Sequence, residues 1–239
     1  IGTHVTPRLR LSSVNEHELR TYELWFQPVA GAVVREEEFS GYVLALTGPS
    51  GVGKSTISRM MVQMFVGYVE PVPIITTRTR KKGDDGEYRY VSKKVFEKWL
   101  AEKEIVAHAT LSSKSEERLY GYRRKDIDAI WQRGRIPVVI TEMHLLQGLA
   151  ETFGRRAILS FGLLPPGASK RARLSALLHR LRTRGRETEE QMADRLKHAE
   201  RDLAFFKESG DLFDHLLVNE DVHGVLAMVK ERVPVLRKA

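Results

Sequence analysis

Cysteine is absent from the 239-residue chain, and so is any long hydrophobic run. The first absence excludes disulfide bonds, cysteine-ligated zinc and thiol catalysis, and it fits a reducing compartment. The longest apolar run, around residues 157–164, is typical of a buried strand, because a span of the bilayer needs roughly 20 residues. The sequence also shows no secretory signal peptide. We therefore expect a cytoplasmic protein with no membrane partner.

Metal-ligand spacing is also missing, because the eight histidines are scattered along the chain. Positive charge is plentiful: the net charge is +8, and lysine and arginine cluster in residues 78–82, 123–125 and 170–186. Each cluster is either a solvated helix face or a site for an anionic partner such as a nucleotide, a nucleic acid or an acidic lipid. Nothing resembles a recognition helix or an RNA-binding motif. We therefore expect small phosphate-bearing partners and no nucleic acid.

The hydrophobic content of 42% and the length are enough for one large α/β domain, with or without an appendage. Residues 1–41 contain an amphipathic stretch at 19–29 and an acidic run at 36–38, but no motif. We expect this segment to be an N-terminal extension, to which the sequence assigns no role. From residue 42 onward, strand and helix patterns alternate.

Short apolar runs predict strands at residues 42–47, 73–77, 88–91, 105–111, 136–141, 157–163 and 213–218. Helical spacing of apolar residues predicts helices at 54–65, 93–102, 126–132, 170–182, 188–206 and 222–233. Ser92 is a suitable N-cap for the second of these helices. Strands that alternate with helices predict a parallel sheet covered on both faces.

A glycine-rich loop with the spacing G-x-x-x-x-G-K-S follows the first strand and precedes a helix. That context identifies a P-loop, whose backbone N–H groups and helix N-terminus bind phosphate oxygens. Lys54 is expected to reach the β- and γ-phosphates, and the Ser55 hydroxyl to ligate Mg²⁺. The candidate nucleotide-binding residues are Gly48, Pro49, Ser50, Gly51, Val52, Gly53, Lys54, Ser55 and Thr56.

A carboxylate at the end of a neighbouring strand usually accompanies the metal of a P-loop. Glu142 directly follows the strand at residues 136–141 and is the candidate for this position, on the acceptor side of the site. The alternative is a surface glutamate at a strand end.

Further motifs follow the P-loop in a fixed order, and together they resemble the guanylate kinase family over about residues 42–235. They are Thr76-Thr77-Arg78, Gly83 and Gly86, Tyr88-Arg89-Tyr90-Val91-Ser92, Phe96, Tyr120-Gly121, Gln147-Gly148, Arg180-Leu181, Arg184-Gly185, Glu189-Glu190, Arg195-Leu196 and Leu217-Val218-Asn219-Glu220-Asp221. The interval from Arg184 to Arg195 fits the family's arginine-bearing segment without a gap.

The resemblance implies an α/β P-loop NTPase fold in residues 42–235 with three parts. They are a core (42–74, 126–167 and 207–235), an inserted acceptor-binding subdomain (75–125) and a helical lid (168–206). It implies ATP and Mg²⁺ as cofactors, and catalysis that consists mostly of positioning and charge neutralisation. Lys54, Arg184 and Arg195 would then be catalytic, and Asn219 would contact the nucleotide. The alternative for the two arginines is an ordinary solvated helix face.

The acceptor site departs from the family in its base contacts. The family's two basic residues and two tyrosines for the acceptor phosphate map to Arg78, Lys81, Tyr88 and Tyr120. Lys81 replaces an arginine, which keeps the charge and loses the bidentate geometry, although Arg80 is adjacent. The three positions that contact guanine fall at Ile74, at Ala107 beside His108, and at Met143 or His144. Either Glu116 or Glu117 is a replacement carboxylate, or both are solvent-facing loop residues.

These residues favour an active kinase of a nucleoside or deoxynucleoside monophosphate, which need not be GMP, because a base pocket without matching polar groups discriminates strongly against the base. A phosphorylated sugar, as in the related ribose bisphosphate kinases, is an alternative acceptor. A second alternative is a non-catalytic interaction module, although such modules generally lose the P-loop lysine and the lid arginines. The sequence predicts no oligomeric state.

Overall fold

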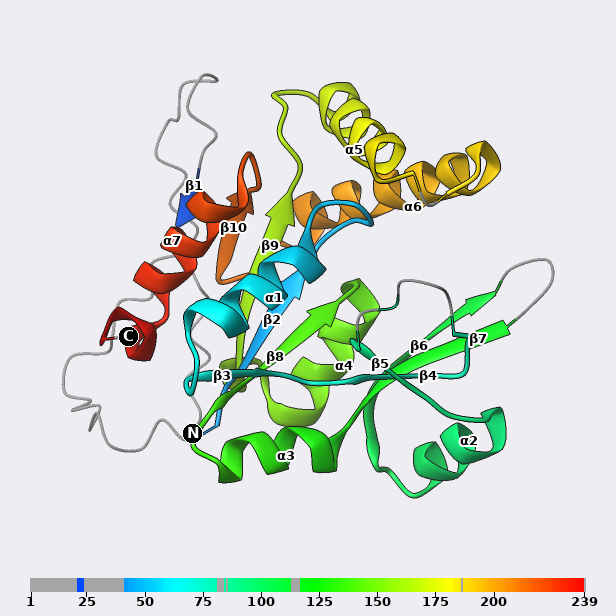
Figure 1. The fold of residues 1–239 in the computed structure, drawn as a ribbon, viewed down its shortest axis with the longest axis vertical. Helices are drawn as coiled ribbons and strands as arrows, with labels where there is room; N and C mark the ends of the chain where they lie inside the picture. Colours follow the sequence, from blue (N-terminus) through cyan, green and yellow to red (C-terminus); the bar gives the residue numbers. More distant parts are fainter. Residues whose placement is uncertain are drawn as a thin grey trace, which may run out of the picture.

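The structure, a computed structural model, describes residues 21–23, 41–80, 84, 86–112, 117–185 and 187–238. These residues form two sheets with helices around them (Figure 1). Among them, no helix is both long and apolar enough to cross a membrane. Lys81 and Glu116 lie outside the described residues, as does most of segment 1–41.

The larger sheet has six strands in the order β1-β10-β9-β2-β8-β3. All neighbours in it are parallel except β1, which pairs antiparallel with β10. The strands are β1 (Thr21–Glu23), β2 (Val43–Thr47), β3 (Val69–Pro71), β8 (Ile136–Thr141), β9 (Ile158–Leu164) and β10 (His215–Val218). This arrangement confirms the predicted fold class, a parallel sheet flanked by helices.

Strand β2 is apolar throughout because both of its faces are covered. Leu44 and Leu46 pack in one core cluster with α1 (Lys54–Met64) and α7 (Val222–Arg232). Val43 and Ala45 pack on the opposite side with α3 (Arg124–Gln132) and α4 (Met143–Phe153). The P-loop therefore begins at the carboxyl end of a fully buried strand, which holds the start of the loop in place.

The smaller sheet has the order β5-β4-β7-β6 and mixes parallel and antiparallel pairs. Its strands are β4 (Ile74–Thr76), β5 (Tyr88–Tyr90), β6 (Ile105–Ser112) and β7 (Glu117–Arg123). One helix, α2 (Lys93–Ala101), covers it by packing Phe96 against Ile75. As predicted, the Ser92 hydroxyl caps this helix by accepting from the N–H of Val95 over 3.3 Å.

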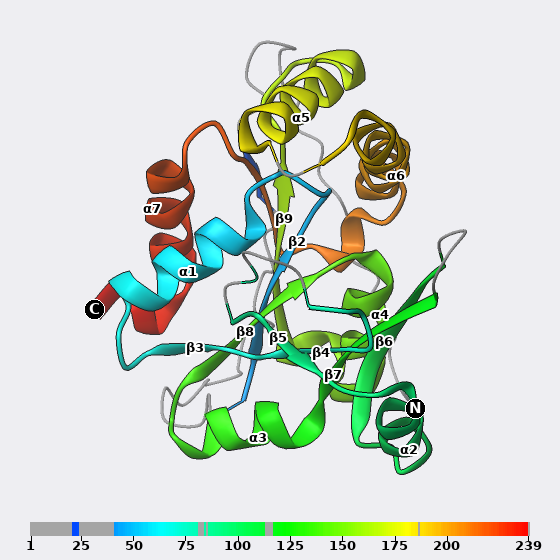
Figure 2. The same ribbon diagram turned by 45° about the vertical axis from the view of Figure 1, so that its right-hand side comes forward.

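Helices α5 (Lys170–Arg184) and α6 (Glu189–Glu208) lie together at the P-loop end of the larger sheet, as both ribbon views show (Figures 1 and 2). Leu177 of α5 and Ala199 of α6 share a core cluster with Val52 of the P-loop. Side-chain caps begin both helices, Ser169 for α5 and Thr188 for α6. The pair is therefore packed directly on the loop that precedes α1.

Three of the predicted strands do not join the parallel sheet. Residues 73–77, 88–91 and 105–111 belong to the second, mixed sheet instead. The sequence pattern did not reveal β7, because this strand begins in the polar stretch that precedes Tyr120. Since β7 forms an antiparallel hairpin with β6, the second sheet could not be recognised without it. The sequence patterns also missed β3, which is short and ends in Pro71, and α4, which contains Gly148. Three short 3₁₀ helices complete the described chain: η1 (Arg155–Ala157), η2 (Gly210–Leu212) and η3 (Pro234–Lys238).

Candidate functional site

The P-loop connects β2 to α1 and fits only glycine at two of its positions. A Cβ atom on Gly48 would lie 2.6 Å from the carbonyl oxygen of Leu163, and one on Gly53 would lie 2.5 Å from Nδ2 of Asn219. Gly53 also has a φ of 111°, which L side chains rarely adopt. The predicted strand, loop and helix are thus present, and the loop leaves a cradle of backbone at the N-terminus of α1.

Lys54 begins α1 and folds back over the loop. Its Nζ donates to the carbonyl oxygens of Gly48 and Pro49, the second over 3.2 Å. Burial lowers the pKa of Lys54, and the nearby carboxylates of Glu142 and Asp202 oppose this by favouring the charged form. The ammonium group is therefore held at the mouth of the loop, where the phosphates of a nucleotide would lie.

Arg195 of α6 and Arg184 at the end of α5 converge on one carboxylate. Both ion-pair with Glu187, whose side chain is only 5% exposed; Arg195 does so over 3.3 Å. Arg195 also donates to the hydroxyl of Ser50 in the P-loop. The structure thus brings the two arginines together on Glu187, and Arg195 also reaches the P-loop.

Asn219, which follows β10, contacts the back of the P-loop. Its Nδ2 donates to the carbonyl oxygen of Val52 over 2.6 Å, and the side chain is almost completely buried. Its Oδ1 has no hydrogen-bond partner among the described residues. The predicted nucleotide residue therefore supports the loop and keeps an unused acceptor atom.

Glu142 lies where the sequence predicted, directly after β8 at the start of α4. It is exposed, and its charge acts on both Lys54 and Tyr120. Asp202 of α6 is a second carboxyl near Lys54, and burial raises the pKa of this group. A third, Glu87, accepts a hydrogen bond from Ser55 Oγ over 3.1 Å.

Arg78 is the centre of the predicted acceptor-phosphate site. Its guanidinium carbon lies 4.3 Å from the ring centroid of Tyr88 and 5.5 Å from that of Tyr90. It also ion-pairs with Asp84 over 2.6 Å, and Tyr90 donates to the same carboxylate. Burial raises the pKa of both Tyr88 and Tyr120, and the charge of Arg78 acts to lower each of them. Tyr88, Tyr90 and the buried Arg78 therefore lie together. Lys81 is outside the described residues.

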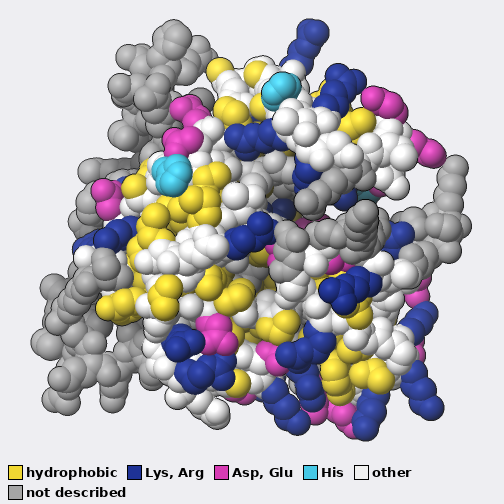
Figure 3. All heavy atoms as spheres, viewed as in Figure 1, with side chains coloured by type: hydrophobic (Ala, Val, Ile, Leu, Met, Phe, Trp, Pro, Cys, Tyr) yellow, Lys and Arg dark blue, Asp and Glu magenta, His cyan; other side chains and the backbone are white. Residues whose placement is uncertain are grey.

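Basic side chains are spread over the face seen in Figure 3, both at the top, where α5 lies in Figure 1, and at the bottom, where α2 and α3 lie. Some of this charge is neutralised by neighbouring acids, as in the pairs of Arg133 and Arg135 with Glu70 and of Arg123 and Lys125 with Glu104. Arg123 stacks on Trp99 and Arg124 on Phe153, and Glu104 neutralises part of the charge of this segment. Arg78, Arg184 and Arg195 lie at the candidate site.

The donor set around the P-loop fits a magnesium ion that is held mainly by a nucleotide. Among the residues described, no three His, Asp or Glu side chains form a cluster that could hold a metal without other ligands. Mg²⁺ usually takes one or two protein oxygens and completes its shell with phosphate oxygens and water. The Ser55 hydroxyl beside a carboxylate meets that requirement.

Comparison with known proteins identifies the lineage of this site. The sequence profile of the family described as guanylate kinase matches residues 40–235. The chain belongs to the guanylate kinase family. It is 30% identical over 190 residues to a guanylate kinase of Homo sapiens, with 79% of this chain and 90% of the relative covered.

Two further comparisons agree with this family. A guanylate kinase of a Nostoc species is 31% identical over 201 residues, which cover 83% of this chain and 92% of the relative. The fold is similar to that of a crystallised guanylate kinase from Anaplasma phagocytophilum, with a TM-score of 0.59, 21% identity and coverage of 83% and 85%. Membership places the chain among P-loop transferases that bind ATP and use Mg²⁺.

Of the positions that the resemblance aligns with guanine contacts, Ile74, Ala107 and Met143 are buried and apolar, whereas His144, the alternative for the third position, is exposed. Ile74 is 7% exposed, Ala107 3% and Met143 5%. Ala107 packs directly on α4, because a Cβ on Gly148 would lie 3.1 Å from the Cβ of Ala107. The neighbouring His108 and His144 are exposed and supply the polar groups near these positions.

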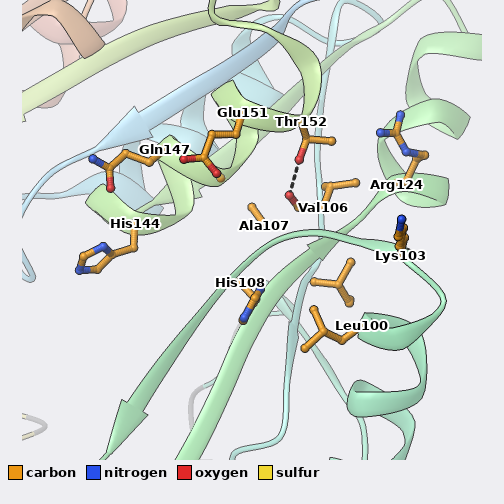
Figure 4. Close-up of a pocket in the computed structure, with 12 residues that line it drawn as sticks. Leu100, Lys103, Val106, Ala107, His108, Arg124, His144, Gln147, Glu151 and Thr152 are labelled. Carbon is orange, nitrogen blue, oxygen red and sulfur yellow. Dashed lines mark hydrogen bonds between the residues drawn. The ribbon is translucent and has the colours of Figure 1, made fainter.

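Ala107 and His144 line one hollow of about 590 Å³ between α4 and β6 (Figure 4). His144, Gln147 and Glu151 reach it from α4, and His108 lies on the facing strand. Ile74 lines a different, much smaller hollow beside Glu87. The structure therefore does not bring the three base positions into one pocket.

Glu117, which the sequence offered as a replacement carboxylate, is exposed and pairs with Lys93 of α2 over 2.6 Å. It lies opposite Ser112 in the hairpin, five residues along β6 from Ala107. Conversely, sequence reasoning assigned no role to Asp84, Glu87, Arg180 or Asp202. Glu87 directly precedes Tyr88, and Arg180 lies within the lid motif. Their positions next to or within motifs are the signals that could have identified them.

Proposed function

We propose that this protein transfers the γ-phosphoryl group of ATP to a nucleoside or deoxynucleoside monophosphate, with Mg²⁺ as cofactor. The observation that carries the proposal is the contact of Arg195 with Ser50 of the P-loop, together with the Glu187 carboxylate that Arg195 shares with Arg184. Arginines that converge on a P-loop are suited to the charge that develops on a transferring phosphoryl group.

In this reaction Lys54 and the glycine-rich loop, residues 48–56, would hold the phosphates of ATP, and Ser55 would hold Mg²⁺, which neutralises phosphate charge. Arg184 and Arg195 would leave Glu187 to stabilise the transferring group. Asn219 would orient the loop and offer its unused Oδ1 to the nucleotide. These roles need only positioning and charge, which is what phosphoryl transfer requires of a protein.

The acceptor phosphate would bind at Arg78, with Tyr88, Tyr120 and Lys81 around it and Glu142 on the same side. The Asp84 carboxylate that pairs with Arg78 over 2.6 Å supports this assignment, because a phosphate forms the same kind of charge-assisted hydrogen bond with a guanidinium. The subdomain of residues 75–125 would thus carry the acceptor, the lid of residues 168–206 would close over it, and residues 42–74, 126–167 and 207–235 would form the core.

The acceptor need not be GMP. Buried Ile74, Ala107 and Met143 offer no side-chain acceptors to the donors of a guanine ring. A base that leaves its polar groups unpaired in a buried site binds poorly, at a cost of about 1–3 kcal/mol for each group. These positions favour another nucleoside monophosphate, and they leave a phosphorylated sugar such as ribose bisphosphate as the alternative acceptor.

An ADP-release assay with Mg²⁺·ATP and a panel of acceptors tests the proposal: GMP, dGMP, AMP, CMP, UMP, dTMP and ribose bisphosphate. We expect turnover with at least one nucleoside monophosphate and its loss in the Lys54→Met variant. Turnover of GMP far above all others would refute the altered base specificity. Tight ATP binding without turnover of any acceptor would favour a non-catalytic interaction module instead.

A further inference from the structure

Glu87 directly precedes β5 of the smaller sheet, and its side chain reaches α1, the helix that follows the P-loop. Its backbone is fixed where β5 begins, because its carbonyl oxygen accepts from the N–H of Ile74 over 2.8 Å. Its carboxylate accepts from Ser55 Oγ in the first turn of α1 over 3.1 Å. The side chain is 23% exposed, so it is held in place and still open to a ligand.

The spacing of the two oxygen atoms matches that of two metal ligands. Octahedral Mg²⁺ takes oxygen ligands at about 2.0–2.1 Å, which puts neighbouring ligand oxygens about 2.9 Å apart. Ser55 Oγ and Glu87 Oε2 are 3.1 Å apart, close to that separation. A hydroxyl and a carboxylate are also the hard oxygen donors that Mg²⁺ prefers.

Both negative and positive side chains lie near the Ser55 hydroxyl: the Glu87 carboxylate would attract a cation, and Lys54 and Arg59 would attract a polyphosphate. Its carboxylate favours the charged form of Lys54, and Arg59 Nη2 lies 4.0 Å from its Oε1. Ser55 by itself would supply one neutral ligand, whereas the carboxylate adds the negative charge that a divalent cation favours. Glu142 is also near Lys54, but it makes no hydrogen bond with Ser55 within the described part of the chain.

We propose that Glu87 is a second protein ligand of the nucleotide-bound Mg²⁺, beside Ser55. This inference rests on the proposed function, since it concerns the metal of the same site. The hydrogen bond between the two side chains would then be replaced by their shared metal ion. Because Glu87 belongs to the smaller sheet, the metal would join the acceptor-binding part of the chain to the ATP-binding part.

Mn²⁺ in the presence of ADP is the probe, and electron paramagnetic resonance of free Mn²⁺ measures its binding to the full chain. In Glu87→Gln, we expect Mn²⁺ to bind the ADP complex about tenfold or more weakly, while ADP binds without metal as in wild type. The control is Glu97→Gln, a glutamate of α2 that is 58% exposed and pairs with Lys93 at 3.9 Å. Its Mn²⁺ affinity should equal that of wild type.

The double variant Ser55→Ala/Glu87→Gln should lose less than the product of the two single losses, because both side chains serve one ion. If Glu87→Gln is unstable in a thermal melt, Glu87→Asp keeps the charge and shortens the reach, and an intermediate loss is expected. Equal Mn²⁺ affinity in the Glu87 and Glu97 variants overturns the metal role of Glu87 and leaves the proposed function intact. Failure of wild type to bind both ADP and Mn²⁺·ADP overturns both proposals.

Discussion

Arg180 of α5 and Asn219 after β10 donate hydrogen bonds to the same atom, the carbonyl oxygen of Val52, over 3.1 and 2.6 Å. Arg180 also donates to the carbonyl oxygen of Asn219 over 2.6 Å. Three segments that are far apart in the chain therefore meet behind the P-loop. These hydrogen bonds hold Val52 in place, the residue that precedes Gly53, and Gly53 is the N-cap of α1.

Replacement of Arg180 should destabilise the protein through these bonds. Hydrogen bonds that involve a charged group contribute about 1.5–3 kcal/mol. The carbonyl oxygens of Val52 and Asn219 would each lose the Arg180 donor, although Asn219 Nδ2 would still donate to that of Val52. We expect Arg180→Ala to lower the free energy of unfolding in urea by about 2 kcal/mol and to weaken ADP binding. Arg182→Ala is the control, because Arg182 is 59% exposed and its pair with Glu189 is 3.8 Å long. An equal effect of the two substitutions would contradict the anchoring role of Arg180.

Gly53→Ala tests the close approach of Asn219 to the loop. The added Cβ would lie 2.5 Å from Nδ2 of Asn219, and the φ of 111° is strained for alanine. We expect a loss of stability of more than about 1 kcal/mol and a loss of ATP binding, measured by urea unfolding and calorimetry. Gly210→Ala, where no atom lies within 4 Å of the new Cβ, should change ATP binding little. Unchanged ATP binding in Gly53→Ala would show that the cradle tolerates a side chain.

The sequence predicted the ATP half of the site better than the acceptor half, for a physical reason. P-loop binding depends on backbone and on the residues of one continuous segment, so the spacing of Gly48, Gly53 and Lys54 already contains its geometry. The convergence of Arg184 and Arg195 on Glu187 follows from two helices that one short turn joins.

Contacts between sheets are not encoded in any single segment. Glu87 and Ser55 are 32 residues apart: Glu87 directly precedes β5 of the smaller sheet and Ser55 lies in α1, so their contact depends on how the smaller sheet packs beside that helix. Asp202 is likewise near Lys54 only because α6 packs over the P-loop. The pairing of the smaller sheet was not predicted either, since local apolar patterns do not say which strands pair.

Loss of either lid arginine should reduce the rate of transfer more than the binding of ATP. Removal of a group that stabilises transition-state charge typically costs about 10²–10³ in kcat. We expect Arg184→Ala and Arg195→Ala to lower kcat by about 10²-fold or more with a smaller change in KM for ATP, in steady-state assays with the best acceptor of the panel. The double variant should fall less than the product of the single losses, because the two arginines act on one group. Arg182→Ala should retain wild-type kcat.

The ion pairs of Glu104 give stability a defined dependence on pH. Arg123 donates to Glu104 over 2.6 Å and Lys125 over 3.3 Å, and the hydrogen bond from Arg123 is the main cause that lowers the pKa of Glu104. A carboxyl whose folded pKa is lowered stabilises the fold fully above its unfolded value and loses that effect as the pH falls through the folded value. The difference in melting temperature between wild type and Glu104→Gln should therefore be constant above pH 4.5, the ordinary value, and shrink below it. A difference that grew on acidification would contradict this sign. In Glu102→Gln, an exposed residue that pairs with Lys98 at 3.8 Å, the difference should stay small throughout.

The Ala107→Glu substitution tests whether the hollow beside Ala107 can bind guanine once a carboxylate is restored there. If this position were an open base site, a glutamate would restore the family's carboxylate and raise activity toward GMP. The structure predicts the opposite, because Ala107 is 3% exposed and packs on Gly148 of α4. We expect a loss of at least about 2 kcal/mol in urea unfolding, from overpacking and an unpaired buried carboxylate, and no gain in kcat/KM for GMP. The control Ala101→Glu, at an exposed position near the end of α2, should leave both quantities close to wild type. A stable Ala107→Glu variant with improved GMP turnover would show that α4 can move away from β6 and that the hollow in Figure 4 is a base site that lacks only its carboxylate.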